Sequence, residues 1–277
     1  MNFDYLNDQT WIVNQDIPWK HLSKDLSEVR IAIITTAGLY MWKTQKPFSF
    51  EDEIPDVSFR EIPNSVTQET VRVSHRYMDL FGSAGVDINS VFPIHRLQEM
   101  VSEKRIGGLA ETHYSVMGEV RDPRLFIEDC MPKILKLLQK QLVDVVLVTP
   151  GGPLGHQTAG MIARFLEEND ITTITIGAVK AIAQNVKSPR TLLVRYPFGM
   201  YFGAPFDTVN QKEIVNECLV HLKAIREPGE VSELSVRWQD TFKTALQIKP
   251  ELPTLMDTGA IIAEPVIEKK KIAADEF

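Results

Sequence analysis

The stretch that decides the fold is residues 143–168, VDVVLVTPGGPLGHQTAGMIARFLEE. Its first seven residues are almost wholly apolar, which is typical of a central parallel strand covered on both faces. A turn rich in glycine and proline follows at 150–155. A helix is then predicted from near Gln157 or Thr158 to Asn169, because apolar side chains recur there at helical spacing. The stretch therefore predicts one strand–turn–helix unit of an α/β sheet.

Working outward, similar short apolar or β-branched runs predict further strands at 29–35, 71–74, 171–176 and 191–194. Apolar residues at steps of three and four predict helices over 127–142 and 214–225. Strands and helices alternate along the chain, which favours a parallel sheet with helices on both faces. The predicted fold class is α/β, a Rossmann-like three-layer sandwich with a mostly parallel sheet.

The chain divides into three predicted parts. Residues 1–27 form a polar N-terminal lead-in with scattered aromatic residues. Residues 28–226 form the α/β domain, which includes a long ordered loop at 42–63. Residues 227–277 are predicted to form a C-terminal helix over 231–247 and an extended tail, either disordered or laid across another subunit.

Composition excludes several classes of protein. The 277 residues carry a formal net charge of −7, which argues against a general nucleic-acid binder. The first residues lack the basic start and apolar run of a signal peptide, and no stretch approaches the roughly 18 apolar residues of a membrane span. Two widely separated cysteines exclude a disulfide framework. A cytoplasmic protein with no nucleic-acid or membrane partner is the prediction.

Two small-residue turns mark the predicted ligand site, because ligands of parallel sheets bind beyond the carboxyl ends of the strands. These turns are 35–38 and 149–155. Glycine lets the backbone approach a ligand, and the free N–H groups of a helix start favour an anion, here a carboxylate. A tight strand–helix connection would need no ligand, so that alternative stays open. The candidate substrate-binding residues are Thr36, Gly38, Gly151, Gly152, Gly155, Gln157, Thr158 and Arg195.

Four residues are candidates for catalysis: His156, His113, Glu111 and His75. His156 lies where the positive end of a helix disfavours imidazolium, so we expect it to be mostly neutral and able to act as a base or donor. The alternative for His156 is a capping role that merely satisfies the turn.

A metal site is the weaker interpretation of the histidines, because none shows the spacing of a strong ligand set. No metal ligand is therefore assigned, and the sequence indicates no obvious cofactor. Arg195 ends an apolar strand and could clamp a carboxylate in a forked geometry. Cys130 and Cys218 fall on apolar helical faces and are expected to be buried and inert.

Several segments, taken in order, resemble the selenoprotein B family of the glycine, sarcosine, betaine and D-proline reductases. They include VRVSH at 71–75, VFPIHRLQEMVSEKRIGGLAETHYSVMG at 91–118, residues 143–168 and PRTLLVRYPFGMYFGAP at 189–205. The resemblance covers roughly residues 28–225. It implies a selenocysteine or cysteine at the position of Gly152 and a second cysteine at that of Gly155. Both are glycine in this chain, so attack by a selenol or thiol at this turn is impossible.

Three hypotheses follow for the function. The first is an enzyme acting on a small amino-acid- or amine-derived substrate, with histidine-assisted C–N or C–C bond chemistry and no selenol or thiol. The second is a non-catalytic or regulatory subunit of a reductase-like complex, and the third is a histidine-dependent metalloenzyme. The expected partners are a small carboxylate or amine substrate, and other copies of the chain or the subunits of a hetero-complex.

Overall fold

The computed structural model describes residues 11–49, 56–75, 83–120 and 122–235. Within these ranges one mixed sheet forms the centre of the molecule, with strands in the order β10-β9-β8-β7-β1-β6-β3 and with β5 also paired to β1. Its strands are β1 (Arg30–Thr35), β3 (Phe59–Pro63), β5 (Gly108–Leu109), β6 (Thr112–Val116), β7 (Val145–Thr149), β8 (Thr172–Gly177), β9 (Arg190–Leu193) and β10 (Glu230–Glu233). A small antiparallel pair, β2 (Leu39–Met41) and β4 (Val71–Val73), lies beside it.

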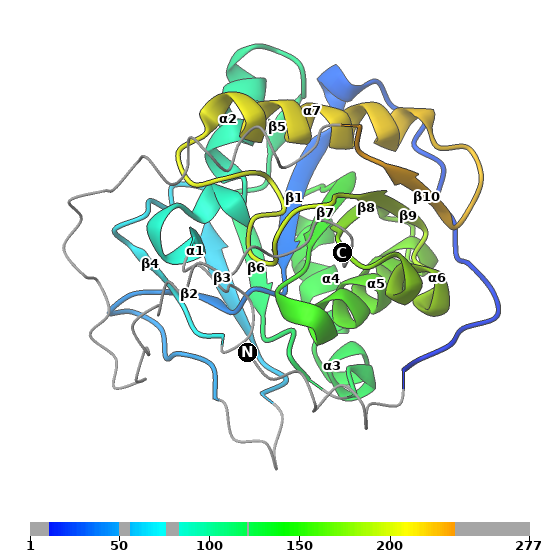
Figure 1. Ribbon diagram of the computed structural model, residues 1–277, viewed down its shortest axis with the longest axis horizontal. Coiled ribbons are helices and arrows are strands. Elements are labelled where there is room, and N and C mark those ends of the chain that lie inside the picture. Colours follow the sequence, from blue (N-terminus) through cyan, green and yellow to red (C-terminus); the bar gives the residue numbers. More distant parts are fainter. Residues whose placement is uncertain (1–10, 50–55, 76–82, 121, 236–277) are drawn as a thin grey trace, which may run out of the picture.

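The predicted parallel α/β fold is confirmed. Strands β10 to β6 all run parallel to their neighbours, and β3 alone is antiparallel, along β6. Helices cover both faces, as Figure 1 shows, with α2 and α7 on one side and α4, α5 and α6 on the other. The helices are α1 (Ser83–Val86), α2 (Ile94–Ser102), α3 (Arg124–Asp129), α4 (Met131–Lys140), α5 (Gly152–Glu168), α6 (Lys180–Val186) and α7 (Thr208–Ala224).

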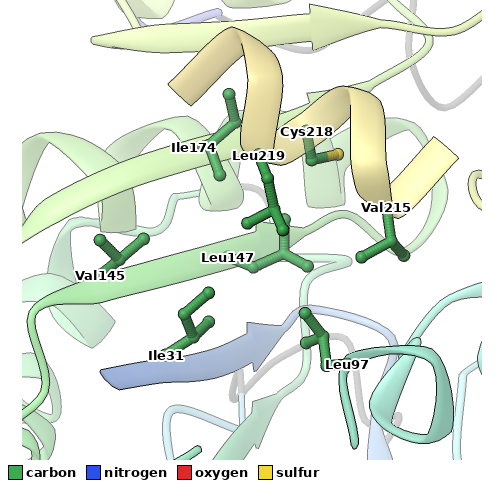
Figure 2. Close-up of a pocket in the computed structure, with 8 residues that line it drawn as sticks. All are labelled: Ile31, Leu97, Val145, Leu147, Ile174, Val215, Cys218 and Leu219. Carbon is green, nitrogen blue, oxygen red and sulfur yellow. The ribbon is translucent and has the colours of Figure 1, made fainter. Parts of the chain in front are cut away.

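Each face of the sheet has its own apolar core. On the α2 and α7 face, alternate residues of β1 and β7 pack against helix side chains, and Figure 2 shows Val215, Cys218 and Leu219 of α7 around the same small space as Leu147 and Ile174. The opposite core lies under α3, α4 and α5. Burial of both faces explains why the central strands read as nearly continuous apolar runs in the sequence.

Several boundaries differ from the sequence prediction. Helix α5 begins at Gly152 and not near Gln157, so most of the predicted turn is its first helical turn. The predicted helix 127–142 is two helices broken at Cys130, because Pro132 cannot continue a preceding helix and sits instead at the start of α4. The loop predicted at 42–63 ends in β3, an edge strand. No helix begins at Val231, where β10 runs instead.

Other predictions fall outside the described residues. The remainder of the predicted helix 231–247 and the predicted tail 249–277 lie there, as do the first ten residues of the lead-in. In the parts that the structure describes, no helix is long and apolar enough to cross a membrane.

Candidate functional site

Strands β1 and β7 meet at the point where the chain order of the sheet reverses, since β6 lies on one side of β1 and β7 on the other. In open α/β sheets the crevice beyond the carboxyl ends at such a point is the usual ligand site. Residues 36–38 follow β1 here, and residues 150–152 lead from β7 into α5. The two predicted turns are therefore brought together, at the position that the fold favours for binding.

Thr36 holds these two turns in contact. Its Oγ1 accepts a hydrogen bond from the backbone N–H of Gly151 at 2.8 Å and lies 3.2 Å from the carbonyl oxygen of Gly155, to which it donates. Thr158 Oγ1 donates to the carbonyl of Gly118 at 2.9 Å, which ties the second turn of α5 to the segment that follows β6. All of these groups are buried, so the first turn of α5 is closed over the ends of three strands.

Glycine is required at this closure for two reasons. A Cβ at Gly151 would lie 2.5 Å from the Cα of Ala37, and one at Gly155 would lie 2.7 Å from Thr36 Oγ1. Gly152 has a φ of +71°, in the left-handed region that other residues enter at a cost of about 1 kcal/mol. Gly38 also combines a positive φ with a close approach, to the carbonyl of Ser74.

His156 lies in the first turns of α5 with both ring nitrogens engaged. Nδ1 donates to the carbonyl of Gly152 at 2.7 Å, and Nε2 accepts the backbone N–H of Ala178 at 3.0 Å, so the ring is a neutral Nδ1–H tautomer. The rings of Phe198 and Tyr201 pack edge-on at 5.6 and 5.5 Å. Burial lowers the pKa of His156 to about 4, with the carbonyl contacts opposing it. The expected neutral state is confirmed, but burial rather than the helix end is its main cause.

His113 lies on β6, with its side chain buried. Its Nδ1 accepts the backbone N–H of Ile33 at 3.0 Å, and its Nε2 lies 3.5 Å from Asn64 Oδ1, with Phe92 edge-on to the ring. The imidazole therefore accepts a hydrogen bond from the main chain of the central strand β1. Burial lowers the pKa of His113 to about 3.

His75 follows β4 and reaches the α5 turn. Its ring is fully buried, hydrogen bonds to the backbone of Gly151, and lies with Nε2 3.8 Å from Glu119 Oε2. Burial lowers the pKa of His75 to about 4, and the Gly151 carbonyl partly opposes this. The buried carboxylate of Glu119, just past the end of β6, was not singled out from the sequence. Recognition of 112–116 as a strand would have placed Glu119 at the same sheet edge as the two turns.

The remaining candidates lie elsewhere. Glu111 is exposed and precedes β6, so it lies toward the amino ends of the strands. Arg195 has a side chain that is 69% exposed and pairs with Glu233 of β10. Gln157 is buried, and its side chain accepts the backbone N–H of Ile12 at 2.8 Å. The structure therefore gathers His75, Thr36, Gly38 and the α5 turn, and it leaves Glu111 and Arg195 outside this cluster.

Both thiols of the chain are remote from the turn. Cys130 lies between α3 and α4 on one face of the sheet, and Cys218 lies on α7 on the other face. Both are buried. Burial raises the pKa of Cys130 to about 11 and that of Cys218 further still. The expectation of buried cysteines is confirmed. Among the described residues, no group of three or more His, Cys, Asp or Glu side chains is arranged to hold a metal ion.

Comparison with known proteins gives one clear relationship. No protein-family model and no solved structure matches the chain. The chain is 32% identical over 216 residues to the D-proline reductase subunit gamma of Acetoanaerobium sticklandii, an alignment that covers 78% of this chain and 87% of the relative. The order of motifs in the sequence had suggested the same relationship. The chain therefore belongs to the selenoprotein B family of the glycine, sarcosine, betaine and D-proline reductases.

Proposed function

We propose that this chain is a subunit of a reductase-type complex that retains the family's strand-end architecture without carrying out selenol or thiol attack itself. The observation that carries the proposal is the α5 turn, where Gly152 and Gly155 supply no reactive atom. Neither cysteine can replace them, because both are buried with raised pKa values and lie on other helices. The thiolate is the attacking form of cysteine, and these thiols are protonated at neutral pH.

The hydrogen bonds of two histidines support a non-catalytic role. His156 and His113 each use both ring nitrogens to hold backbone or side-chain groups of the fold, and each is neutral. A ring held in this way positions the main chain and has no lone pair left to take a substrate proton. The relative is named as one subunit of D-proline reductase, and a cytoplasmic hetero-complex is the setting that we infer for this chain by analogy.

The test of this proposal uses the full chain alone and with candidate partner subunits encoded beside its gene. We expect size-exclusion chromatography with light scattering to detect a mixed complex. The chain alone should give no dithiol-dependent reduction of glycine, sarcosine, betaine or D-proline. The double variant Cys130→Ser, Cys218→Ser controls for hidden thiol chemistry. The proposal would be refuted if the wild-type chain reduced one of these substrates and the double variant did not.

A second candidate function is a histidine-assisted enzyme, and one observation favours it. His75 and Glu119 form a buried acid–base pair at the switch point of the sheet, beside the carbonyl of Gly151. Such a pair could move a proton on a small amino-acid- or amine-derived substrate.

The two candidate functions differ in a measurable way. Under aerobic, thiol-free conditions the second predicts turnover of small amino acids or amines that falls at least about a hundredfold in His75→Gln, the usual size of a lost acid–base group. His156→Gln serves as the comparison variant. Equal turnover in wild type and His75→Gln would remove the pair from any mechanism.

A further inference from the structure

A small cavity lies behind His156, between α5, α6 and the adjoining strands β8 and β9. Its polar lining consists of His156 and the hydroxyl residues Thr175, Ser188 and Thr191, and glycines at 160 and 177 leave the space open. It is separate from the strand-end cluster around Thr36, because it lies on the β8 and β9 side of the α5 turn. The space is that of about one water molecule, too small for a metabolite.

The hydroxyl groups around this cavity are incompletely satisfied. Thr191 is 1% exposed, and its Oγ1 has no hydrogen-bond partner among the described residues. Ser188 Oγ donates to Thr175 Oγ1 at 3.4 Å, which is long for a hydroxyl pair. Leaving a buried hydroxyl without a partner costs about 1–3 kcal/mol. We therefore expect a bound molecule to supply the hydrogen bond here.

We propose that this cavity is a binding site for one ordered water molecule, which joins the hydroxyls of Thr191, Ser188 and Thr175. Buried water typically makes about three hydrogen bonds to polar groups that the protein leaves unsatisfied. No charged side chain lines the cavity, and His156 is neutral, so the site suits a neutral molecule that both donates and accepts. An ion would be desolvated there without a counter-charge.

The water has a structural consequence for the α5 turn. It lies next to the ring that links Gly152 at the helix start to Ala178 after β8. A water bonded to β8, β9 and the segment before β9 would hold these elements at the spacing that His156 bridges. This inference holds whether the chain is a catalytic or a non-catalytic subunit.

Gly177 offers a direct way to displace the water. A Cβ at this position would meet only ordinary contacts, with His156 Cδ2 at 3.4 Å and Thr191 Cγ2 at 3.8 Å, and its backbone φ is not in the left-handed region. Gly177→Ala should therefore fold and put a methyl group at the cavity. Gly160 is unsuitable for the same purpose, since a Cβ there would lie 2.8 Å from Val186 Cγ1.

The experiment is a high-resolution crystal structure of the full chain, repeated for three variants and combined with thermal unfolding. We expect one water within hydrogen-bond distance of Thr191 Oγ1 in the wild type and in Thr191→Ser, and none in Gly177→Ala. Thr191→Val, which removes the hydroxyl at equal volume, should lose the water, and its unfolding midpoint should differ from that of Thr191→Ser by about 2–4 °C.

The opposite results would overturn the proposal. A wild-type structure with Thr191 Oγ1 bonded to a protein carbonyl and no water in the cavity would do so. Density for a molecule larger than water would also contradict it. If Thr191→Val and Thr191→Ser unfold at the same temperature while both retain the water, the hydroxyl is not its partner and the assignment fails.

Discussion

The two ends of the parallel strands bury polar groups in different ways. At the amino ends, Arg190 of β9 pairs with Glu167 of α5, both almost fully buried, and the guanidinium lies 3.5 Å over the ring of Trp19. At the carboxyl ends, the described groups that meet at the α5 turn are Thr36, a neutral His75, and backbone amides and carbonyls, with the Glu119 carboxylate 3.8 Å from His75. The comparison indicates that the amino end is held by a buried ion pair, whereas the carboxyl end depends on neutral imidazoles.

The first way to test this contrast is acidification, with the largest expected effect. The folded pKa values of His75 and His156 are about 4, below the ordinary value of about 6.5, so the unfolded chain binds protons first as the pH falls. Stability is therefore fully present above pH 6.5 and is lost between about pH 6.5 and 4. Each pH unit by which folding lowers the pKa of one histidine corresponds to about 1.4 kcal/mol of stability that is lost on acidification.

The measurement is the urea midpoint at pH 7, 6 and 5. We expect it to fall steeply, and His156→Gln should reduce the slope because one titrating ring is removed. A midpoint that stays level from pH 7 to pH 5 would contradict neutral burial of these rings.

The second test breaks the charged clamp. Arg190→Met leaves the Glu167 carboxylate buried without its cation and should reduce the free energy of unfolding by about 3–5 kcal/mol. Adding Glu167→Leu should restore much of this loss, because an apolar pair replaces two buried charges. The matched control is Arg195→Ala, whose exposed ion pair should not affect stability measurably. Equal losses in Arg190→Met and Arg195→Ala would remove the distinction between the two ends.

The third test concerns the closure by Thr36. Gly155→Ala should destabilise the protein by about 1–3 kcal/mol, since the new methyl group would overlap Thr36 Oγ1. Gly108→Ala is the control, because a Cβ there meets nothing within 4 Å. In a Thr36→Ala background the cost of Gly155→Ala should shrink. An unchanged cost in that background would mean that Thr36 is not the obstacle.

The smallest effect is expected from the tie between α5 and the end of β6. Thr158→Val keeps the side-chain shape and removes the hydrogen bond to the Gly118 carbonyl, so we expect a loss of about 0.5–1.5 kcal/mol by chemical denaturation. Thr158→Ser retains the hydroxyl and serves as the control. If the valine variant is the more stable of the two, the bond contributes nothing to the closure.

The sequence was sufficient to predict the strands that are buried on both faces of the sheet. Strands β1, β7 and β8 were predicted within two residues, because every residue in them except Arg30 is buried. Strand β6 was missed because its THYSV sequence is polar, and its burial depends on His113 accepting an N–H from Ile33, 80 residues earlier. Long-range contacts of this kind leave no local pattern in the sequence.

The candidate site was predicted in part for the same reason. Glycines at 151–155 indicated a turn, but their actual role is close packing against Thr36, which lies more than a hundred residues away in the chain. Glycine disfavours a helix interior, which is why a turn was expected here, but Pro153 suits the first turn of a helix, and the close approach to Thr36 requires glycine at Gly155. Glu119 was missed because the strand that positions it was missed.

The central place of β1 has a consequence for how the protein is made. Its partners β6 and β7 lie about 80 and 115 residues further along the chain, so β1 cannot pair until much of the polypeptide has left the ribosome. Until then an apolar strand with both edges open is exposed, which favours slow folding and aggregation of truncated chains. Fragments that stop before residue 149 should accumulate in inclusion bodies rather than form a smaller stable domain.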